Sequence, residues 1–356
     1  MTPLRVGFVG CGEHARMSLY PSLRAAFGGA PAGLPALVLT QQGRQQPPLV
    51  AELVALADHK RALAERVAAF HGVRAVYTDH RLMLERERLD AVLVCMHPRR
   101  QAAVAIDCLE RGVHVWVEKP PAESIQEATA MAAAARRVGK QLAVGYMKRF
   151  SSPYRRAKAF VDQPAFGEPS VFESRYTYGQ YPVDVYRFLN GFATHHLDLP
   201  RFFLGEIESV YAEHVRRGKG LEGYALTLRF SNGGVGLVNV NCLEGEHNNW
   251  SERVAVTGVG GRVFVENWRR VIGFLPDSPT YYWEPEDIRP ADDQNSLAVH
   301  GFVGELRDFV ESVREGRVPA CTIDDGLAAL RLEQAINLSV ERHCTVLLSE
   351  VQDDGK

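Results

Sequence analysis

The chain has 356 residues, of which 46% are hydrophobic and 24% are charged, and its formal net charge is -2. This length suits two domains, and the near-neutral charge gives no reason to expect nucleic acid or an anionic membrane as a partner. No apolar run is long enough to span a bilayer. None of the six cysteines forms a C-x-x-C pair, so we expect free thiols in a cytoplasmic protein. Because the first expected strand starts near the N-terminus, we expect no signal peptide.

The first apolar run, RVGFV at residues 5–9, leads directly into GCGEHA at residues 10–15. This is a G-x-G-x-x-A pattern between an expected strand and an expected helix over residues 14–27. Gly10 supplies the positive φ of the tight turn, Gly12 lets the backbone approach a diphosphate, and Ala15 is small enough for the helix to pack closely. A tight turn without a ligand is the alternative. The pattern predicts a dinucleotide site at Gly10, Cys11, Gly12, Glu13, His14 and Ala15.

Strands and helices alternate over the residues that follow. A stretch rich in Gly, Pro and Gln at residues 28–48 is expected to be an insertion or a long loop. The alternation predicts a doubly wound parallel sheet of the Rossmann type, and apolar strands fit a sheet covered on both faces. We expect strands at 52–57, 73–77, 91–95, 114–117 and 141–146, and helices at 61–70, 81–87, 101–111 and 123–138.

The pattern changes near residue 150, where segments with period-two alternation are joined by glycine-rich turns. This pattern predicts a largely antiparallel sheet. We expect its strands at 170–178, 207–215, 223–231, 235–242, 252–258 and 261–267, one helix at 192–204, and two amphipathic helices at 300–315 and 324–342.

The predicted fold class is α/β, with an N-terminal Rossmann domain and a C-terminal α+β domain that has a large, mostly antiparallel open sheet. The dinucleotide-binding domain is expected over residues 1–122. The substrate and oligomerisation domain is expected over 123–295, with 123–150 still attached to the Rossmann sheet. The helices of residues 296–356 are expected to pack back on the Rossmann domain.

Asp58 ends the second expected strand, where a carboxylate can accept hydrogen bonds from an adenosine ribose. The alternative is an N-cap of the following helix. Because Lys60 and Arg61 follow closely, a 2′-phosphate also fits there. We therefore expect NAD as the cofactor, with NADP as the alternative.

Glu118 and Lys119 end the strand before the long helix of residues 123–138. Ligands of a doubly wound sheet lie beyond the carboxyl ends of its strands, so Lys119 is expected to exchange a proton with a substrate hydroxyl. A surface lysine, or one paired with Glu118, is the alternative. Met96 and His97 follow the preceding strand and join the expected cofactor site, together with Glu118 and Lys119.

A second group of polar residues, THHLD at residues 194–198, lies near the start of the helix in the second domain. A neutral His195 can accept the proton of an alcohol as a hydride leaves the same carbon. Asp198 can hold the ring in one tautomer, or it can pair with Arg201. H-H-x-D lacks a further nearby ligand, so we expect no metal. A structural histidine is the alternative.

Several motifs in this order resemble the glucose-fructose oxidoreductase / inositol dehydrogenase / rhizopine-catabolism (Gfo/Idh/MocA) family. The resemblance rests on VGFVGCGEHA, ALAD, LDAVLVCMHP, GVHVWVEKP and LAVGYMKRF in the first domain. In the second domain it rests on HHLDLPRFFLGEIESV and on ELRDFVESVREGR near the C-terminus.

The resemblance implies a nicotinamide cofactor, a sugar, cyclitol or related polyol as substrate, and a sheet that often forms the oligomer interface. It implies that Lys119 contacts the reacting hydroxyl and that His195 is the acid/base. We predict an NAD(P)-dependent oxidoreductase that acts as a dimer or tetramer. The alternatives are an NAD-dependent glycosidase of the same fold and a non-catalytic dinucleotide-binding regulator. Candidate substrate-binding residues are Lys119, Arg149, Tyr178, Tyr181, His195, His196 and Asp198.

The chain departs from the family pattern at two positions. The family often has an Asp four residues before the histidine, where this chain has Gly191. Asp184 or Asp198 is the expected substitute, and a shortened proton relay is the alternative. The loop after Cys95 usually carries a histidine at the position of Gln101. Both departures affect the expected substrate and proton transfer, not the fold.

Overall fold

A computed structural model describes residues 2–27, 49–179, 187–243, 251–285 and 293–351. Its tertiary contacts divide the chain into two compact units. Unit 1 contains residues 1–150, 291–327 and 355–356, and unit 2 contains residues 151–290 and 328–354. The first boundary between the units falls after Phe150, so the segment 123–150, which we expected to stay attached to the Rossmann sheet, lies in unit 1. The C-terminal helices are shared between the units. The expected insertion at 28–48 lies outside the described residues.

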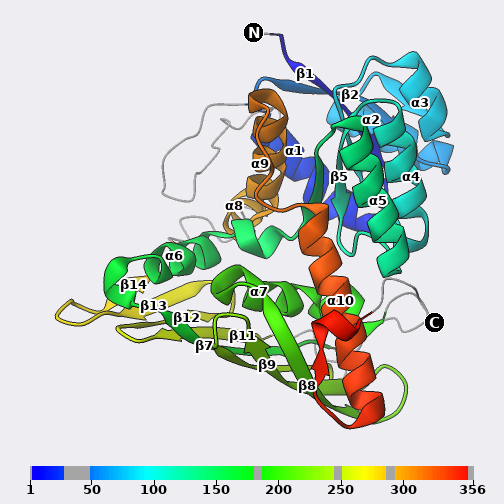
Figure 1. Ribbon diagram of the computed structural model, residues 1–356. Helices are drawn as coiled ribbons and strands as arrows, with labels where there is room; N and C mark the ends of the chain where they lie inside the picture. Colours follow the sequence, from blue (N-terminus) through cyan, green and yellow to red (C-terminus); the bar gives the residue numbers. More distant parts are fainter. Residues whose placement is uncertain (1, 28–48, 180–186, 244–250, 286–292, 352–356) are drawn as a thin grey trace. The chain divides into compact units, whose positions relative to one another are not determined.

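Unit 1 is built on a six-stranded sheet with the strand order β3-β2-β1-β4-β5-β6. Figure 1 labels β1, β2 and β5 of this sheet. Every neighbouring pair in this sheet is parallel. The order of the strands reverses between β1 and β4, which is the point where ligands bind in doubly wound sheets. The strands are β1 (Leu4–Val9), β2 (Ala51–Ala57), β3 (Ala75–Tyr77), β4 (Ala91–Val94), β5 (His114–Glu118) and β6 (Leu142–Gly145).

Helices cover both faces of the sheet in unit 1. One layer contains α1 (Tyr20–Ala26), which contacts α8 (Asp293–His300) and α9 (Phe302–Glu315). The other contains α4 (Pro98–Glu110) and α5 (Ile125–Val138), which contact each other (Figure 1). Because both faces are covered, all four residues of β4 are buried. The remaining helices are η1 (Ala15–Leu19), α2 (Arg61–His71), α3 (His80–Arg86) and η2 (Met147–Phe150).

The strands and helices predicted for unit 1 are present within a few residues of their predicted bounds, apart from the first helix, which is divided. Its beginning, η1, is π-helical, and regular α-helix starts only at Tyr20. Pro21 lies in the first turn of α1 and has no N–H to donate to the carbonyl four residues earlier. The regular helical ladder is therefore interrupted just after the glycine turn, where π-helical turns often accompany functional sites.

Unit 2 is built on a nine-stranded sheet with the order β14-β13-β12-β11-β7-β10-β9-β8-β15. The pair β7–β10 is parallel, and the other neighbouring pairs are antiparallel. The mostly antiparallel sheet predicted from the period-two pattern is therefore confirmed. The strands are β7 (Pro169–Thr177), β8 (Ile207–Arg216), β9 (Glu222–Phe230), β10 (Val235–Asn241), β11 (Ser251–Gly258), β12 (Arg262–Glu266), β13 (Arg270–Phe274), β14 (Tyr281–Trp283) and β15 (Val346–Leu347).

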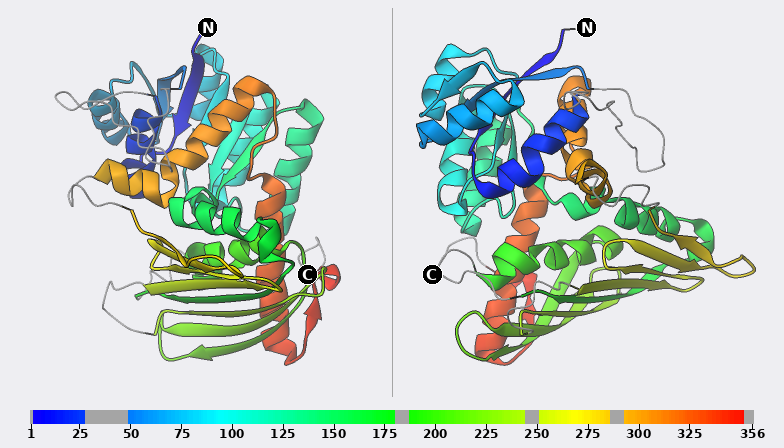
Figure 2. Two further views of the ribbon diagram at one scale, coloured as in Figure 1. Left: turned by 90° about the vertical axis from the view of Figure 1, so that its left-hand side faces the viewer. Right: turned by 180° about the vertical axis from the view of Figure 1, so that it is seen from behind.

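One face of this sheet is covered by helices. Two of them, α6 (Ser152–Val161) and α7 (Thr194–Leu204), pack on β12, β13, β7 and β10 (Figure 2). Along β9, Leu226 and Leu228 are buried while Ala225, Thr227 and Arg229 on the alternate positions are exposed. The opposite face of the sheet is thus exposed within this unit. The other helices are η3 (Pro164–Phe166), η4 (Leu189–Ala193), η5 (Leu348–Glu350) and the part of α10 (Ile323–Arg342) that belongs to unit 2.

Apart from the short helices η2, η3 and η5, five elements were not predicted: α6, α8, β13, β14 and β15. The start of α6 carries a recognisable signal, since Pro153 occupies its first turn. By contrast, β15 has two residues, and its strand character depends on pairing with the distant β8. No helix among the described residues is long and apolar enough to cross a membrane.

Candidate active site

Gly10 makes the turn that follows β1. Its φ is +108°, and a Cβ atom at this position would lie 2.0 Å from the backbone carbonyl oxygen of Cys95. The three nearest atoms are all backbone atoms of Cys95, so no side-chain rotation relieves the overlap. The positive φ predicted for Gly10 is confirmed, and the structure adds a second reason for glycine, which is the close approach of the β4 end.

The backbone at Gly12 lies open, because a Cβ atom there would meet no atom within 4 Å. Ala15 behind it is fully buried at the start of η1. This arrangement provides room for a diphosphate close to backbone amides at a helix start. Glu13 is exposed beside this space.

Asp58 braces the glycine turn from the end of β2. Its Oδ2 accepts a hydrogen bond from the Cys11 amide at 2.7 Å, and its Oδ1 accepts one from the Lys60 amide at 2.8 Å. The N-cap of α2 is Lys60, so the alternative prediction that Asp58 itself caps this helix is wrong. The carboxylate instead joins two loops at the edge where an adenosine ribose is expected.

Glu118 connects the glycine turn to the end of β5. Its Oε1 lies 2.7 Å from Nε2 of His14, and its Oε2 accepts a hydrogen bond from the Lys119 amide. Glu118 is buried, whereas the side chain of His14 is about half exposed. The pair holds the Lys119 backbone at the carboxyl ends of the parallel strands, and the Lys119 side chain is half-buried there.

Gln101 occupies the position at which the family pattern has a histidine, and it is fully buried. Its Nε2 donates to the carbonyl oxygens of Glu118 and, at 2.9 Å, of Pro120, and its Oε1 accepts from the Met96 amide at 3.3 Å. One amide side chain therefore ties the segment that carries Lys119 to the loop after β4. Sequence reasoning noted this position but found no role for it.

Met96 and His97, both half-buried, lie in that loop. His97 is the N-cap of α4, and its Nδ1 accepts a hydrogen bond from the Arg99 amide at 3.3 Å. The two residues are thus at the carboxyl end of β4, the edge predicted to face the cofactor.

Sequence reasoning missed a second residue, Glu305, on the first turn of α9. Its side chain is 2% exposed, and neither carboxyl oxygen has a hydrogen-bond partner among the described residues. Burial raises the pKa of Glu305 well above its usual range, and Glu118 raises it further, while Lys119 lowers it. The sequence carried no signal for this site, because the burial of Glu305 depends on α9 packing against η1, η2 and α1.

These features fit a dinucleotide cofactor. The glycine turn leaves an open space over backbone amides. Asp58 lies on the β2 side of β1. Glu118 and Lys119 lie on the β4–β5 side, and the buried carboxyl group of Glu305 interacts electrostatically with them. Among the described residues, no group of three or more His, Cys, Asp and Glu side chains is arranged to hold a metal ion.

The adjacent histidines of α7 have different surroundings in unit 2. His196 is fully buried; its Nδ1 lies 2.6 Å from Oγ of Ser174, and its Nε2 lies 3.3 Å from Oε2 of Glu252. Tyr154 donates to the other oxygen of Glu252 at 2.8 Å. Because both ring nitrogens of His196 are engaged in this network, a structural role is favoured over the predicted contact with substrate.

His195 is also buried, with 5% of its surface exposed, and Asp198 is buried one turn further along α7. Arg201, the alternative partner for Asp198, forms an ion pair with Glu206. At the position of the family's aspartate, Gly191 lies in η4. Asp184, the other predicted substitute, lies outside the described residues.

The remaining predicted substrate-binding residues are divided. In unit 1, Arg149 is buried, and its Nη1 lies 2.9 Å from Oδ1 of Asp325, so an ion pair engages this guanidinium. In unit 2, Tyr178 follows β7, and its ring lies 5.0 Å from that of Phe192. Tyr181 lies outside the described residues.

Comparison with known proteins agrees with this description. The family described as "Oxidoreductase family, NAD-binding Rossmann fold" matches residues 4–146, and the "GFO/IDH/MocA C-terminal domain" matches residues 154–264. The myo-inositol 2-dehydrogenase of Thermotoga maritima is 26% identical over 313 residues, which are 83% of this chain and 89% of that protein. The scyllo-inositol 2-dehydrogenase (NAD(+)) of Bacillus subtilis is 28% identical over 301 residues, covering 80% and 85%.

A solved structure, the dehydrogenase from Chromobacterium violaceum, superimposes with a TM-score of 0.81 at 21% identity, covering 96% of this chain and 97% of that one. This likeness concerns the fold. Together with the two family matches and the glycine turn, it leads to one conclusion: the chain belongs to the Gfo/Idh/MocA family of oxidoreductases, whose N-terminal domain is an NAD-binding Rossmann fold.

Proposed function

We propose that this oxidoreductase transfers a hydride between NAD and a carbinol carbon of a cyclitol or sugar. The observation that carries the substrate class is the likeness over more than three quarters of the chain to two dehydrogenases named for inositols. The intact glycine turn, Lys119 and His195 support the same proposal, because each residue type that the reaction needs is present.

When bound, NAD supplies the hydride acceptor at C4 of its nicotinamide ring. His195 accepts the hydroxyl proton of the substrate, and the Lys119 ammonium polarises the same oxygen, so that the alcohol loses a proton and a hydride and becomes a carbonyl. In the reverse direction, His195 returns the proton. Gln101 and Glu118 hold the Lys119 backbone in place through the contacts described above.

The test is a spectrophotometric assay of purified protein with NAD+ and a panel of inositols, hexoses and their keto forms with NADH. Lys119→Ala and His195→Asn should each lower kcat by about 10²–10⁴-fold, and ADP-ribose binding should be retained. Lys140→Ala, a lysine elsewhere in unit 1, is the matched control and should keep full activity. Turnover by Lys119→Ala equal to that of the wild type would remove this lysine from the mechanism.

A double-mutant cycle tests whether the two residues act on one hydroxyl. Groups that act as a unit lose little further rate when the second is removed. The double variant should therefore be about as slow as the slower single variant. Additive losses in log rate would instead mean that Lys119 and His195 act independently.

The identity of the dinucleotide is a separate proposal, in which NAD is the physiological cofactor. Asp58 stands where a ribose 2′-hydroxyl is expected and would repel a 2′-phosphate. Lys60 and Arg61 are exposed nearby and favour the phosphate. The ratio of kcat/KM for NAD+ and NADP+ decides the matter, and Asp58→Ala should shift it toward NADP+.

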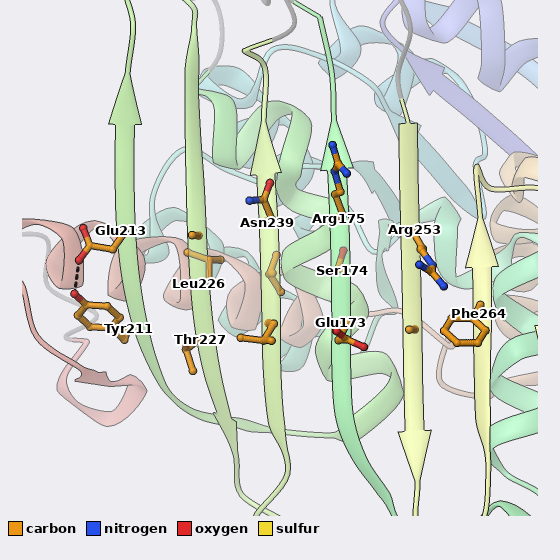
Figure 3. A pocket seen from close by; sticks show the side chains of 14 residues that line it. Glu173, Ser174, Arg175, Tyr211, Glu213, Leu226, Thr227, Asn239, Arg253 and Phe264 are labelled. Atoms are coloured by element: carbon orange, nitrogen blue, oxygen red, sulfur yellow. Dashed lines mark hydrogen bonds between the residues drawn. The ribbon is translucent and has the colours of Figure 1, made fainter.

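We also propose that the exposed face of the nine-stranded sheet pairs with a second copy of this chain. The face carries a hollow of about 540 Å³ whose lining combines carboxylates, guanidinium groups and apolar side chains (Figure 3). A two-fold interface brings the same patch of each copy together, so a patch with both charges can complement itself. The lining includes the exposed residues Glu173, Arg175, Glu213, Leu237 and Arg253 and the half-buried Phe264.

Light scattering coupled to gel filtration tests this oligomer. Leu237 is 53% exposed on this face. Leu237→Arg should convert a dimer or tetramer into a smaller species, because the interface would then bury the positive charge of this arginine from both copies. Val318→Arg, at an apolar residue of unit 1 that is 68% exposed, is the control and should leave the mass unchanged. A monomeric wild type would refute the proposal.

We propose a cytoplasmic location as well. All six cysteines are free, and five of them are buried or half-buried. Free thiols are typical of reducing compartments. Fractionation of cells that express the protein tests this location.

A further inference from the structure

Glu305 is a buried carboxyl group that the proposed reaction does not use. It is 2% exposed, and both of its oxygens lack a hydrogen-bond partner among the described residues. A carboxylate without partners is unfavourable in a buried position, so folding favours the neutral, protonated form. A buried polar group in this state requires an explanation.

The strand order relates Glu305 to one half of the cofactor site. Asp58 directly follows β2 on one side of β1, while Cys95 follows β4 and Glu118 ends β5 on the other side. In this fold the diphosphate lies over the glycine turn after β1, with the adenosine on the β2 side. The nicotinamide half therefore belongs to the β4–β5 side. Glu305 interacts electrostatically with Cys95, Glu118 and Lys119, all of which are on that side.

The packing of α9 supports this placement independently. The ring of Phe302, one turn before Glu305, lies 5.7 Å from the ring of His14, and His14 is bonded to Glu118. The first turn of α9 thus packs beside the start of the helix that follows the glycine turn. The other titratable or charged residues described on elements packed against α9 are Arg16, Tyr20, Arg24, Lys148, Arg149 and His300.

Glu118 and Lys119, at the end of β5, are the charged residues that shift the pKa of Glu305. Glu118 disfavours a second negative charge, and Lys119 favours it. The charge of Arg149 is matched by Asp325. A new positive charge close to these residues would favour ionisation of Glu305.

We propose that Glu305 holds a proton in the cofactor-free protein and releases it to solvent when NAD+ binds. The carboxyl O–H breaks, the carboxylate remains to balance the positive charge of the oxidised nicotinamide ring, and no electron is transferred. The ring of NADH is neutral, so its binding leaves the proton in place. This inference rests on the proposed function. It predicts that the preference for NAD+ over NADH rises with pH, by up to about tenfold per pH unit.

The test is isothermal titration calorimetry of the full chain with NAD+, NADH and ADP-ribose. Each ligand is titrated in buffers of different ionisation enthalpy across neutral pH, which gives the number of protons exchanged. The wild type should release up to about one proton more with NAD+ than with NADH or ADP-ribose. Glu305→Gln keeps the shape of the side chain and should abolish this difference. Glu333→Gln, at a buried carboxyl group in unit 2, is the matched control and should retain it.

Equal proton release with NAD+ and NADH in the wild type would overturn the inference, and this measurement does not depend on any variant folding. A difference that persists in Glu305→Gln would also overturn it, because another group would then be the source. If neither NAD+ nor ADP-ribose binds, the proposed function fails too. Normal binding of both without a difference in protons leaves the proposed function intact and refutes only the role of Glu305.

Discussion

Gly10→Ala should lower the stability of the protein, whereas Gly12→Ala should weaken NAD+ binding without lowering stability. The two glycines are only two positions apart in one motif. At Gly10, an L-residue with φ of +108° adds strain of roughly 1–3 kcal/mol. Its Cβ would also lie 2.0 Å from the Cys95 carbonyl oxygen, and forcing atoms apart in a packed region typically costs about 1–3 kcal/mol more. The sum, roughly 2–6 kcal/mol, is a large part of a typical free energy of unfolding of about 5–15 kcal/mol.

Gly12 has no positive φ, and its Cβ would meet nothing within 4 Å. Gly12→Ala should therefore leave stability unchanged or raise it by about 0.4–1 kcal/mol through the unfolded state. The added methyl group would instead occupy the space open to the diphosphate and weaken NAD+ binding by about tenfold or more, which is about 1.4 kcal/mol.

Urea unfolding and NAD+ titration of both variants provide the measurements. The reasoning is refuted if Gly10→Ala unfolds within about 1 kcal/mol of the wild type, a change typical of substitutions without a specific clash. It is also refuted if Gly12→Ala binds NAD+ with wild-type affinity, since the space over Gly12 would then not be used by the cofactor.

Three further outcomes are expected. Gln101→Leu should lose about 1–3 kcal/mol of stability and lower kcat with little change in the dissociation constant for NAD+; unchanged kcat would contradict its role in holding Lys119. Burial raises the pKa of Glu333 from 4.5 to about 7. The stability that the protonated carboxyl group gives the folded state is therefore fully present below about pH 4.5 and is lost as the pH rises through about 7. That is about 3 kcal/mol, and Glu333→Gln should flatten this slope in urea midpoints. His196→Leu should lose about 3–5 kcal/mol by leaving Glu252 buried with fewer partners, whereas calorimetry should show His195→Asn close to wild-type stability.

The fold was largely predictable because its signals are local. Strictly apolar strands and period-two strands identified the two sheets, and the glycine turn identified the ligand edge. The irregular start of the first helix was not predicted, although Pro21 stands in the sequence, because an apolar helical pattern continues through it. The short strands β13, β14 and β15 gain their structure from neighbours rather than from their own residues.

The candidate site was predicted less completely, for a related reason. Gly10, Asp58 and Lys119 carry signals in their position relative to strands. Glu305 looks like any exposed acid on an amphipathic helix until α9 is packed beside η1. His196 and His195 are adjacent in sequence, and only the contacts with Ser174 and Glu252 distinguish the structural histidine.

The path of the chain restricts how this protein can be cut or recombined. Unit 1 is completed by residues 291–327, and the helix α10 begins in one unit and continues in the other. A fragment that stops at Phe150 would lack α9 and leave the apolar side of α1 bare. A chimera that exchanges the nucleotide-binding part with a relative therefore has to carry two separate gene segments. If only the first segment were exchanged, α1 of one protein would have to pack against α9 of the other protein.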